Sequence, residues 1–155
     1  MNVPPTDLLG TWALSRVVDD RLTGERREVV GVATLALEAP DRVRWHEEGT
    51  MTWPGHDVPV SRTLYVAHDD SASTGWFVHF EDGRPFHPWT IGAPVDHPCG
   101  RDHYRGLLAA HGDPVSRWTV EWDVLGPAKN YRMTTTHTAR RNPSFDPPRP
   151  VLYPG

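Results

Sequence analysis

The sequence predicts an all-β protein, a single up-and-down antiparallel barrel of about eight to ten strands that follows one short helical turn. Most segments alternate apolar and polar residues with period two, which is the strand pattern. Turns rich in Gly, Pro, Asn and Asp separate these segments at short intervals. No long stretch has the periodicity of a helix. A two-sheet sandwich is the alternative, but successive hairpins favour a barrel because closure removes the sheet edges.

The elements follow one another in a simple order. Residues 6–9 can form one helical turn, with Thr6 or Asp7 as the N-cap. Nine strands follow, and they are predicted at residues 12–18, 28–37, 42–53, 58–67, 75–81, 85–91, 102–110, 118–124 and 131–140. Residues 92–101 are predicted as an irregular loop because Pro and Gly interrupt the alternation there. Residues 103–111 are the best helical alternative.

Length, charge and cysteine content limit the classes of function. A chain of 155 residues predicts one domain, here a barrel over residues 1–141 and a Pro-rich tail over residues 142–155. The net charge of −4, without a basic stripe, argues against nucleic acid as a partner. No apolar run approaches the roughly 18 residues of a membrane span, and the start lacks a signal-peptide pattern. A single cysteine excludes an internal disulfide framework, so we expect a cytoplasmic protein. The expected partner is a small molecule, and a homodimer remains open.

The stretch from Gly83 to Tyr104 concentrates reactive side chains. His87, His97, Cys99, Asp102 and His103 are all types that bind transition metals. Their spacing matches no standard zinc motif, and a second cysteine pair is missing. We therefore predict no metal site. The interpretation without a metal is that these are polar loop residues and that Cys99 packs as a small apolar side chain.

The same stretch also suggests acid–base catalysis. His97 or His87 would be the base, Asp102 would orient it, and Tyr104 would donate a hydrogen bond. Asp102 and Tyr104 are two residues apart, so a strand would direct both side chains to the same face. Cys99 would be a nucleophile only if a neighbouring histidine lowered its pKa. The competing interpretation is a loop that closes the barrel mouth through local hydrogen bonds.

Two arginines suggest an anion site. Arg16 and Arg62 each share a strand face with apolar residues, which predicts that they point inwards. A buried guanidinium group needs a carboxylate or a ligand anion as its partner. Internal pairing with Glu47 or Glu48 is the alternative, and such structural pairs are the commoner case.

Aromatic residues and a few polar ones complete the predicted ligand site. The sequence has seven tryptophans, of which Trp12, Trp118 and Trp122 fall on apolar strand faces and are predicted core. The strand residues His79 and His137 could ligate haem iron, but no motif selects haem, and we predict no cofactor. The further ligand-binding candidates are Trp45, His79, Trp89, Lys129 and Tyr131.

The residues Asp7-Leu8-Leu9-Gly10-Thr11-Trp12 resemble the start of the lipocalin and fatty-acid-binding (calycin) superfamily. The resemblance implies that Trp12 plugs the closed end of a barrel and that Arg140 or Arg141 packs over it. It also implies an internal Arg and Tyr for a ligand carboxylate. Residues 8–140 resemble more closely an uncharacterised bacterial family of lipocalin-like barrels. The matching residues are Leu9-Gly10-Thr11-Trp12 with Arg16, Glu48-Gly49, Ser61-Arg62, Phe80-Glu81-Asp82-Gly83-Arg84 with Phe86-His87, His97 and Cys99, Asp102 and Tyr104, and Gly126-Pro127 with Lys129 and Tyr131.

Two functions of different class follow from these observations. The first is binding of a small, largely apolar ligand inside the barrel, with Arg16 or Arg62 meeting an anionic or polar end. The second is a small barrel enzyme of the isomerase, cyclase or lyase type, which moves protons through His97, Asp102 and Tyr104 with His87 nearby. The family resemblance supports the fold and does not choose between them.

Overall fold

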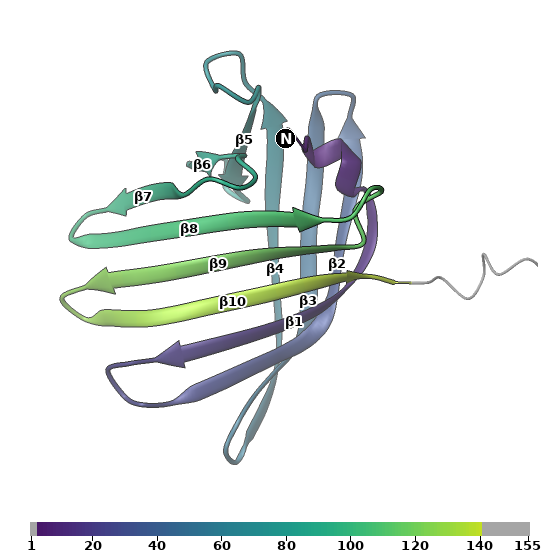
Figure 1. The fold of residues 1–155 in the computed structure, drawn as a ribbon. Coiled ribbons are helices and arrows are strands. Elements are labelled where there is room, and N and C mark those ends of the chain that lie inside the picture. Colours follow the sequence, from purple (N-terminus) through teal and green to yellow (C-terminus); the bar gives the residue numbers. More distant parts are fainter. Residues whose placement is uncertain (1–2, 141–155) are drawn as a thin grey trace, which may run out of the picture.

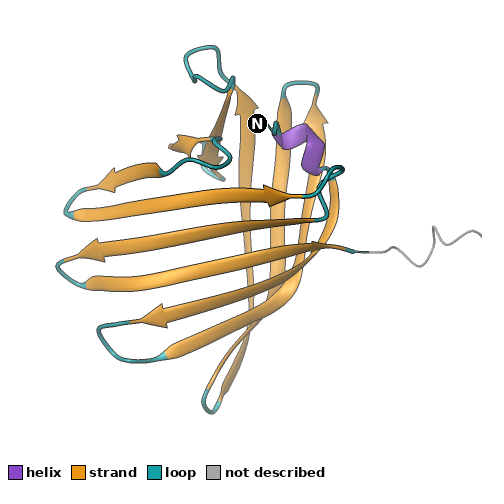
Figure 2. Ribbon diagram, in the orientation of Figure 1, coloured by secondary structure: helices purple, strands orange, loops and turns teal. Residues whose placement is uncertain are grey.

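The computed structural model describes residues 3–140, and the predicted tail at 142–155 lies outside the described residues. Strands make up most of this part, with one 3-10 turn, η1, near the N-terminus (Figure 2). The elements are η1 (Pro5–Leu8), β1 (Gly10–Asp20), β2 (Arg26–Ala39), β3 (Arg42–Trp53), β4 (His56–His68), β5 (Trp76–Phe80), β6 (Pro85–Pro88), β7 (Val95–Cys99), β8 (Asp102–His111), β9 (Arg117–Gly126) and β10 (Lys129–Ala139).

The ten strands form one antiparallel sheet in the order β6-β5-β4-β3-β2-β1-β10-β9-β8-β7. The sheet curls into a nearly closed barrel, with β7–β10 and β1 crossing in front of β2–β5 (Figure 1). Consecutive strands pair except β6 and β7, and β1 pairs with β10. The two edge strands, β6 and β7, are consecutive in the chain, and we call the gap between them the seam. This topology confirms the predicted up-and-down barrel.

The link between β6 and β7 draws the seam together. Ile91 forms a parallel bridge with Leu108 on β8. The backbone N–H of Gly92 donates to the Leu108 carbonyl oxygen at 2.7 Å. The chain between the edge strands is thus attached to the opposite side of the sheet, which leaves β6 and β7 facing each other at the seam.

Three local expectations need correction. The segment predicted as loop at 92–101 contains strand β7, and Pro98 is tolerated there because β7 is an edge strand. The helical alternative at 103–111 is wrong, because these residues belong to β8. The N-terminal turn begins after Pro4, with no capping side chain, so neither Thr6 nor Asp7 is its N-cap. Pro5, whose φ is already set for a helix, starts the turn instead.

The N-terminal turn packs on a cluster of tryptophans that fills one end of the barrel. The indole N–H of Trp12 donates to the Leu8 carbonyl oxygen at 2.8 Å, and that of Trp89 donates to the Val3 carbonyl oxygen at 2.8 Å. Trp118 contacts Trp12 edge-on, with ring centroids 6.1 Å apart. Trp12 therefore lies in the barrel end, as the resemblance implied. No helix among the described residues is long and apolar enough to cross a membrane.

The expected arginine over Trp12 is not part of this cluster. The side chain of Arg140 is exposed, and only its backbone N–H contacts the first strand, donating to the Thr11 carbonyl oxygen at 3.4 Å. Arg141 lies outside the described residues. Among the described aromatic contacts, Trp118 supplies the one to Trp12.

Candidate functional site

A cavity of about 460 Å³ lies inside the barrel beside the seam. Both edge strands contribute to it, together with β4, β5, β8, β9 and β10, so its walls are drawn from most of the sheet. Its lining residues are Arg62, Phe80, Arg84, Pro85, Phe86, His97, Cys99, Tyr104, Trp122, Val124, Tyr131 and Met133. Volume and lining are typical of a site for a small organic molecule.

Aromatic rings form one wall of the cavity. Phe80 and Phe86 stack with centroids 4.4 Å apart, and Phe86 stacks on Trp122 with centroids 5.0 Å apart. Trp122 lies flat against Gly106, its cross-strand partner on β8, so closely that a Cβ at Gly106 would collide with the six-membered ring. The missing side chain of this glycine thus makes room for the indole.

A buried charge cluster adjoins the aromatic wall. Glu47 on β3 accepts hydrogen bonds on one oxygen from Arg16 Nη2 at 2.8 Å and from Arg62 Nε at 2.6 Å. Arg16 Nε also donates to Thr135 Oγ1 at 2.8 Å. The alternative predicted for both arginines, internal pairing with Glu47, is therefore present. A second cavity of about 130 Å³ lies on the other side of Arg62 and is lined by Arg16 and Glu47.

The charges of this cluster do not cancel. Two guanidinium groups share one carboxylate, so among the described residues this group of three keeps one net positive charge. Burial would raise the pKa of Glu47, but Arg62, His137 and Arg16 hold that pKa far below its usual range. Burial and the neighbouring Arg62 lower the pKa of Arg16. Arg62 is the more exposed arginine and is the one that lines the larger cavity.

His137 completes the buried cluster. Its Nδ1 lies 3.2 Å from the Trp118 carbonyl oxygen, which can only accept, so Nδ1 carries the hydrogen. Its Nε2 lies 3.7 Å from Glu47 Oε2, which is too long for a hydrogen bond, and both atoms are buried without a hydrogen-bond partner among the described residues. Burial lowers the pKa of His137, although Glu47 opposes this effect. His137 also stacks on Trp118, with centroids 3.5 Å apart.

Tyr104 reaches the cavity with its hydroxyl group held by a lysine. Lys129 Nζ donates to Tyr104 Oη at 2.9 Å and lies 3.2 Å from Asp102 Oδ2. The hydrogen bonds to Tyr104 and Asp102 raise the pKa of Lys129, which keeps it cationic. Burial and the nearby Tyr104 raise the pKa of Tyr131, which also lines the cavity. Lys129 itself lies outside the lining.

The structure separates the predicted catalytic group. His97 and Tyr104 are cross-strand partners and line the same cavity, with ring centroids 5.8 Å apart. Asp102 pairs with Cys99 in the register and with Lys129 through its side chain, so among the described contacts it is not bound to His97. Within residues 3–140, no three His, Cys, Asp or Glu side chains gather as metal ligands would.

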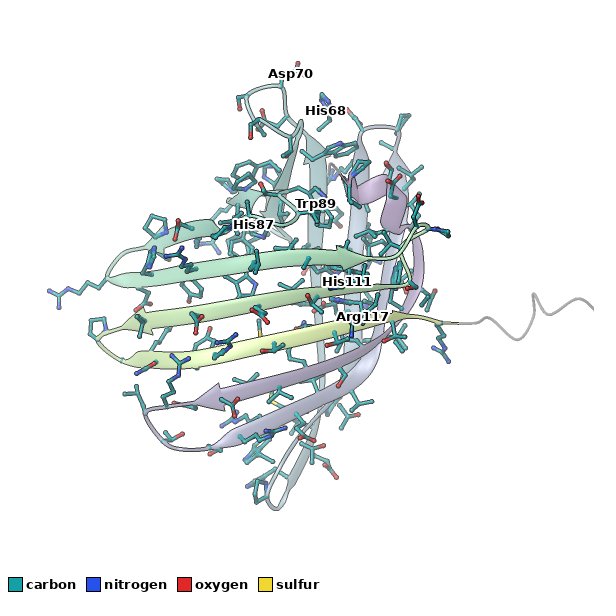
Figure 3. The ribbon with its side chains drawn as sticks, in the orientation of Figure 1. His68, Asp70, His87, Trp89, His111 and Arg117 are labelled. Carbon is teal, nitrogen blue, oxygen red and sulfur yellow. The ribbon has the colours of Figure 1, made fainter. Side chains whose placement is uncertain are left out.

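His87 lies in the core next to the cavity. Its side chain is 2% exposed, and Nδ1 lies 2.7 Å from the Pro88 carbonyl oxygen. Burial lowers the pKa of His87 to about 4, against the opposing effect of that hydrogen bond. His87 and Trp89 lie where the chain around β6 approaches β8 (Figure 3). His87 is neutral at neutral pH and does not line the cavity.

The other ligand-binding candidates lie elsewhere. Trp45 and Trp89 are buried in the tryptophan cluster, with their centroids 6.2 Å apart, and neither lines the cavity. His79 alternates with the inward residues Val78 and Phe80 and contacts Phe77 on the outer face of β5. The sequence interpretation missed Phe80, Phe86, Val124 and Met133 as lining residues and placed Trp122 only in the core. Alternation on β5, β9 and β10 carries the signal that these side chains point inwards.

Solved structures with the same architecture include an S-type phycobiliprotein lyase from Guillardia theta. It has a TM-score of 0.65 and 11% sequence identity, over 89% of this chain and 91% of that chain. A redesigned β-barrel bound to DFHBI has a TM-score of 0.48 and 14% identity, over 87% and 97% of the two chains. A de novo designed fluorescence-activating β-barrel has a TM-score of 0.47 and 12% identity, over 88% and 96%.

At these identities, the likeness of the first structure concerns the fold, and the barrel is lipocalin-like. No curated protein sequence matches the chain. The model of a family of unknown function matches residues 8–139, which is most of the chain, and the protein therefore belongs to the DUF6314 family.

Proposed function

We propose that the protein binds a small, largely apolar molecule with an anionic end in the cavity beside the seam. Arg62 is the anion partner, and Tyr104, Tyr131 and His97 supply further polar contacts. One observation carries the proposal. Arg62 lines a cavity whose other walls are mainly aromatic and apolar. The described carboxylates leave its positive charge unbalanced. A partly desolvated cation in such a place is stabilised by a ligand anion.

The hydrogen bonds of Arg62 leave it able to take part in binding. Among the described residues, only its Nε donates to a protein acceptor, namely Glu47. The terminal nitrogens have the fork geometry that matches a carboxylate or a sulfonate. Arg16, in contrast, donates to both Glu47 and Thr135 and is 9% exposed. Arg16 therefore fixes Glu47, and Glu47 positions Arg62.

A pair of fluorescent probes tests the anion site. 1-Anilinonaphthalene-8-sulfonate carries a negative charge, and N-phenyl-1-naphthylamine has nearly the same rings without it. We expect Arg62→Met to weaken binding of the sulfonate by about tenfold or more and to change binding of the amine by less than about twofold. Fluorescence titration gives both dissociation constants, and one bound probe per chain marks a specific site.

Arg44→Met is the matched control, because Arg44 is exposed on the outer face of β3 and the substitution removes the same charge. This variant is expected to bind both probes as the wild type does. Equal affinity of wild type and Arg62→Met for the sulfonate would contradict the anion site. Loss of both probes together in Arg62→Met would also contradict it, because the arginine would then maintain the shape of the cavity and not the charge.

A second candidate function is proton transfer on a bound molecule by His97 and Tyr104. It is favoured by their position across from each other in the same cavity. Phenylpyruvate carries an aromatic ring, a carboxylate and acidic methylene protons, so it can report such chemistry. The expected result is faster exchange of these protons for deuterium, followed by proton NMR, which His97→Gln and Tyr104→Phe each slow. A rate equal to that in buffer alone refutes this candidate.

A further inference from the structure

We infer that the anion bound in this cavity is a planar aromatic molecule and not an open-chain aliphatic one. The inference rests on the proposed function, because it concerns the class of ligand that the same cavity accepts. Six of the twelve lining residues carry aromatic rings, counting His97. Apart from Cys99, the acyclic apolar side chains in the lining are only Val124 and Met133.

The rings are oriented in two directions. Phe80, Phe86 and Trp122 are nearly parallel, with interplanar angles of 16° and 12° between successive rings. Tyr104 stands at 78° to Trp122, and His97 stands at 77° to Phe86. Because Gly106 covers one face of Trp122 and Phe86 covers the other, a flat molecule would meet the parallel set at Phe80 and at the ring edges, and it would make edge-to-face contacts with the perpendicular set. A flexible alkyl chain gains no such directional contacts.

Phe86 shows how this wall holds a flat ring. Its ring lies between Phe80 and Trp122, in contact with both. The register of β5 with β6 shifts at this point, so that His87 and Pro85 pair with consecutive residues and Phe86 is the extra residue of a bulge. The bulge turns the Phe86 side chain towards the cavity, where it forms part of the lining. The wall therefore already accommodates one aromatic ring by stacking.

One ring of each set is held in place before any ligand binds. Trp122 is 3% exposed and is fitted against Gly106. The hydroxyl group of Tyr104 accepts the hydrogen bond from Lys129. A preorganised wall of this kind favours a rigid ligand, since an alkyl chain loses rotational freedom when it is confined and a fused ring system does not.

Two carboxylates of nearly equal size distinguish a preference for an aromatic ligand from a preference for an aliphatic one. 2-Naphthoate is flat and aromatic, and decanoate is flexible and aliphatic, while both carry the group that Arg62 would bind. We expect wild-type protein to bind 2-naphthoate about tenfold more tightly than decanoate, measured by isothermal titration calorimetry. Phe86→Leu is expected to reduce this preference to about threefold or less, because it removes the middle ring of the stack.

Phe77→Leu is the matched control, because Phe77 lies on β5 outside the cavity lining and the change is the same. It is expected to keep the wild-type preference. If decanoate binds the wild type as tightly as 2-naphthoate does, and Arg62→Met weakens the binding of both, the aromatic inference is overturned and the anion site stays in place. Binding of neither carboxylate overturns the proposed function and this inference together. The wild-type comparison decides the matter even if Phe86→Leu fails to fold.

Discussion

His87 is expected to make the protein sensitive to mild acid. The imidazole is buried edge-on against Phe86 and Trp122, with ring centroids 4.7 and 5.2 Å away, and its pKa falls to about 4. In the unfolded chain the pKa returns to about 6.5. Between pH 6.5 and pH 4 the unfolded state therefore binds a proton at His87 that the folded state does not bind. The stabilising contribution is present above pH 6.5 and is lost as the pH falls towards 4.

The size of the effect follows from proton linkage. These two pKa values give a total loss of about 3 kcal/mol in the free energy of unfolding, of which about 2 kcal/mol is lost between pH 7 and pH 5. His87→Phe keeps a flat ring that cannot titrate. We expect it to be less stable than wild type at pH 7 by about 1–2 kcal/mol, because the Pro88 carbonyl oxygen loses its donor. Its further loss between pH 7 and pH 5 is expected to be about 2 kcal/mol smaller than that of wild type.

Urea unfolding, followed by tryptophan fluorescence at pH 7 and pH 5, measures both quantities. His137 is also buried with a lowered pKa and adds to the acid sensitivity of both proteins, so the difference between them isolates His87. His79→Phe removes a histidine from the outer face of β5 and serves as the control for the substitution itself. An equal loss between pH 7 and pH 5 in wild type and His87→Phe would refute the assignment of His87 as a neutral core residue.

Three substitutions test other parts of the barrel. Glu47→Gln leaves two guanidinium groups buried without a carboxylate. We expect it to lower the free energy of unfolding by about 3–5 kcal/mol, measured with urea at pH 7. A loss below about 1 kcal/mol would mean that the arginines find other partners. Gly106→Val forces Trp122 into the cavity, so binding of the anionic probe should fall by about tenfold or more with unchanged far-UV circular dichroism, and unaltered binding would contradict the proposed location. Gly31→Val brings a side chain against the backbone of β3, and we expect its melting temperature to drop by at least about 5 °C, whereas Val30→Thr on the exposed face should change it little.

Much of the fold could be predicted because inward and outward positions alternate along long strands. Trp12, Leu14 and Arg16 share the inward face of β1, and the structure buries all three. β7 escaped prediction because it is short and contains Pro98, and a proline in a short segment indicates a turn. The position of a strand at the edge of a sheet depends on the closure of the whole barrel, which local alternation does not encode.

The site was harder to predict because it depends on strands that are not neighbours. Arg16 on β1 and Glu47 on β3 meet on the inner face of the sheet, over β2, which lies between their strands. Alternation indicates that both side chains point inwards, and it does not indicate that they touch. The sequence alone predicts Asp102 as the orienting partner of His97 or His87. The register places His97 opposite Tyr104, and Lys129 from the adjoining hairpin binds Asp102 instead.

The seam has a further consequence for the behaviour of the protein in a crowded solution. An unpaired strand edge invites another chain to extend the sheet, which is a common beginning of aggregation. Pro85, Pro88 and Pro98 lie on the two edge strands, and each lacks the amide hydrogen that such an extension requires. Neither edge can therefore offer an uninterrupted row of donors. The barrel can stay incompletely closed beside its cavity without presenting a template on which a second copy could grow.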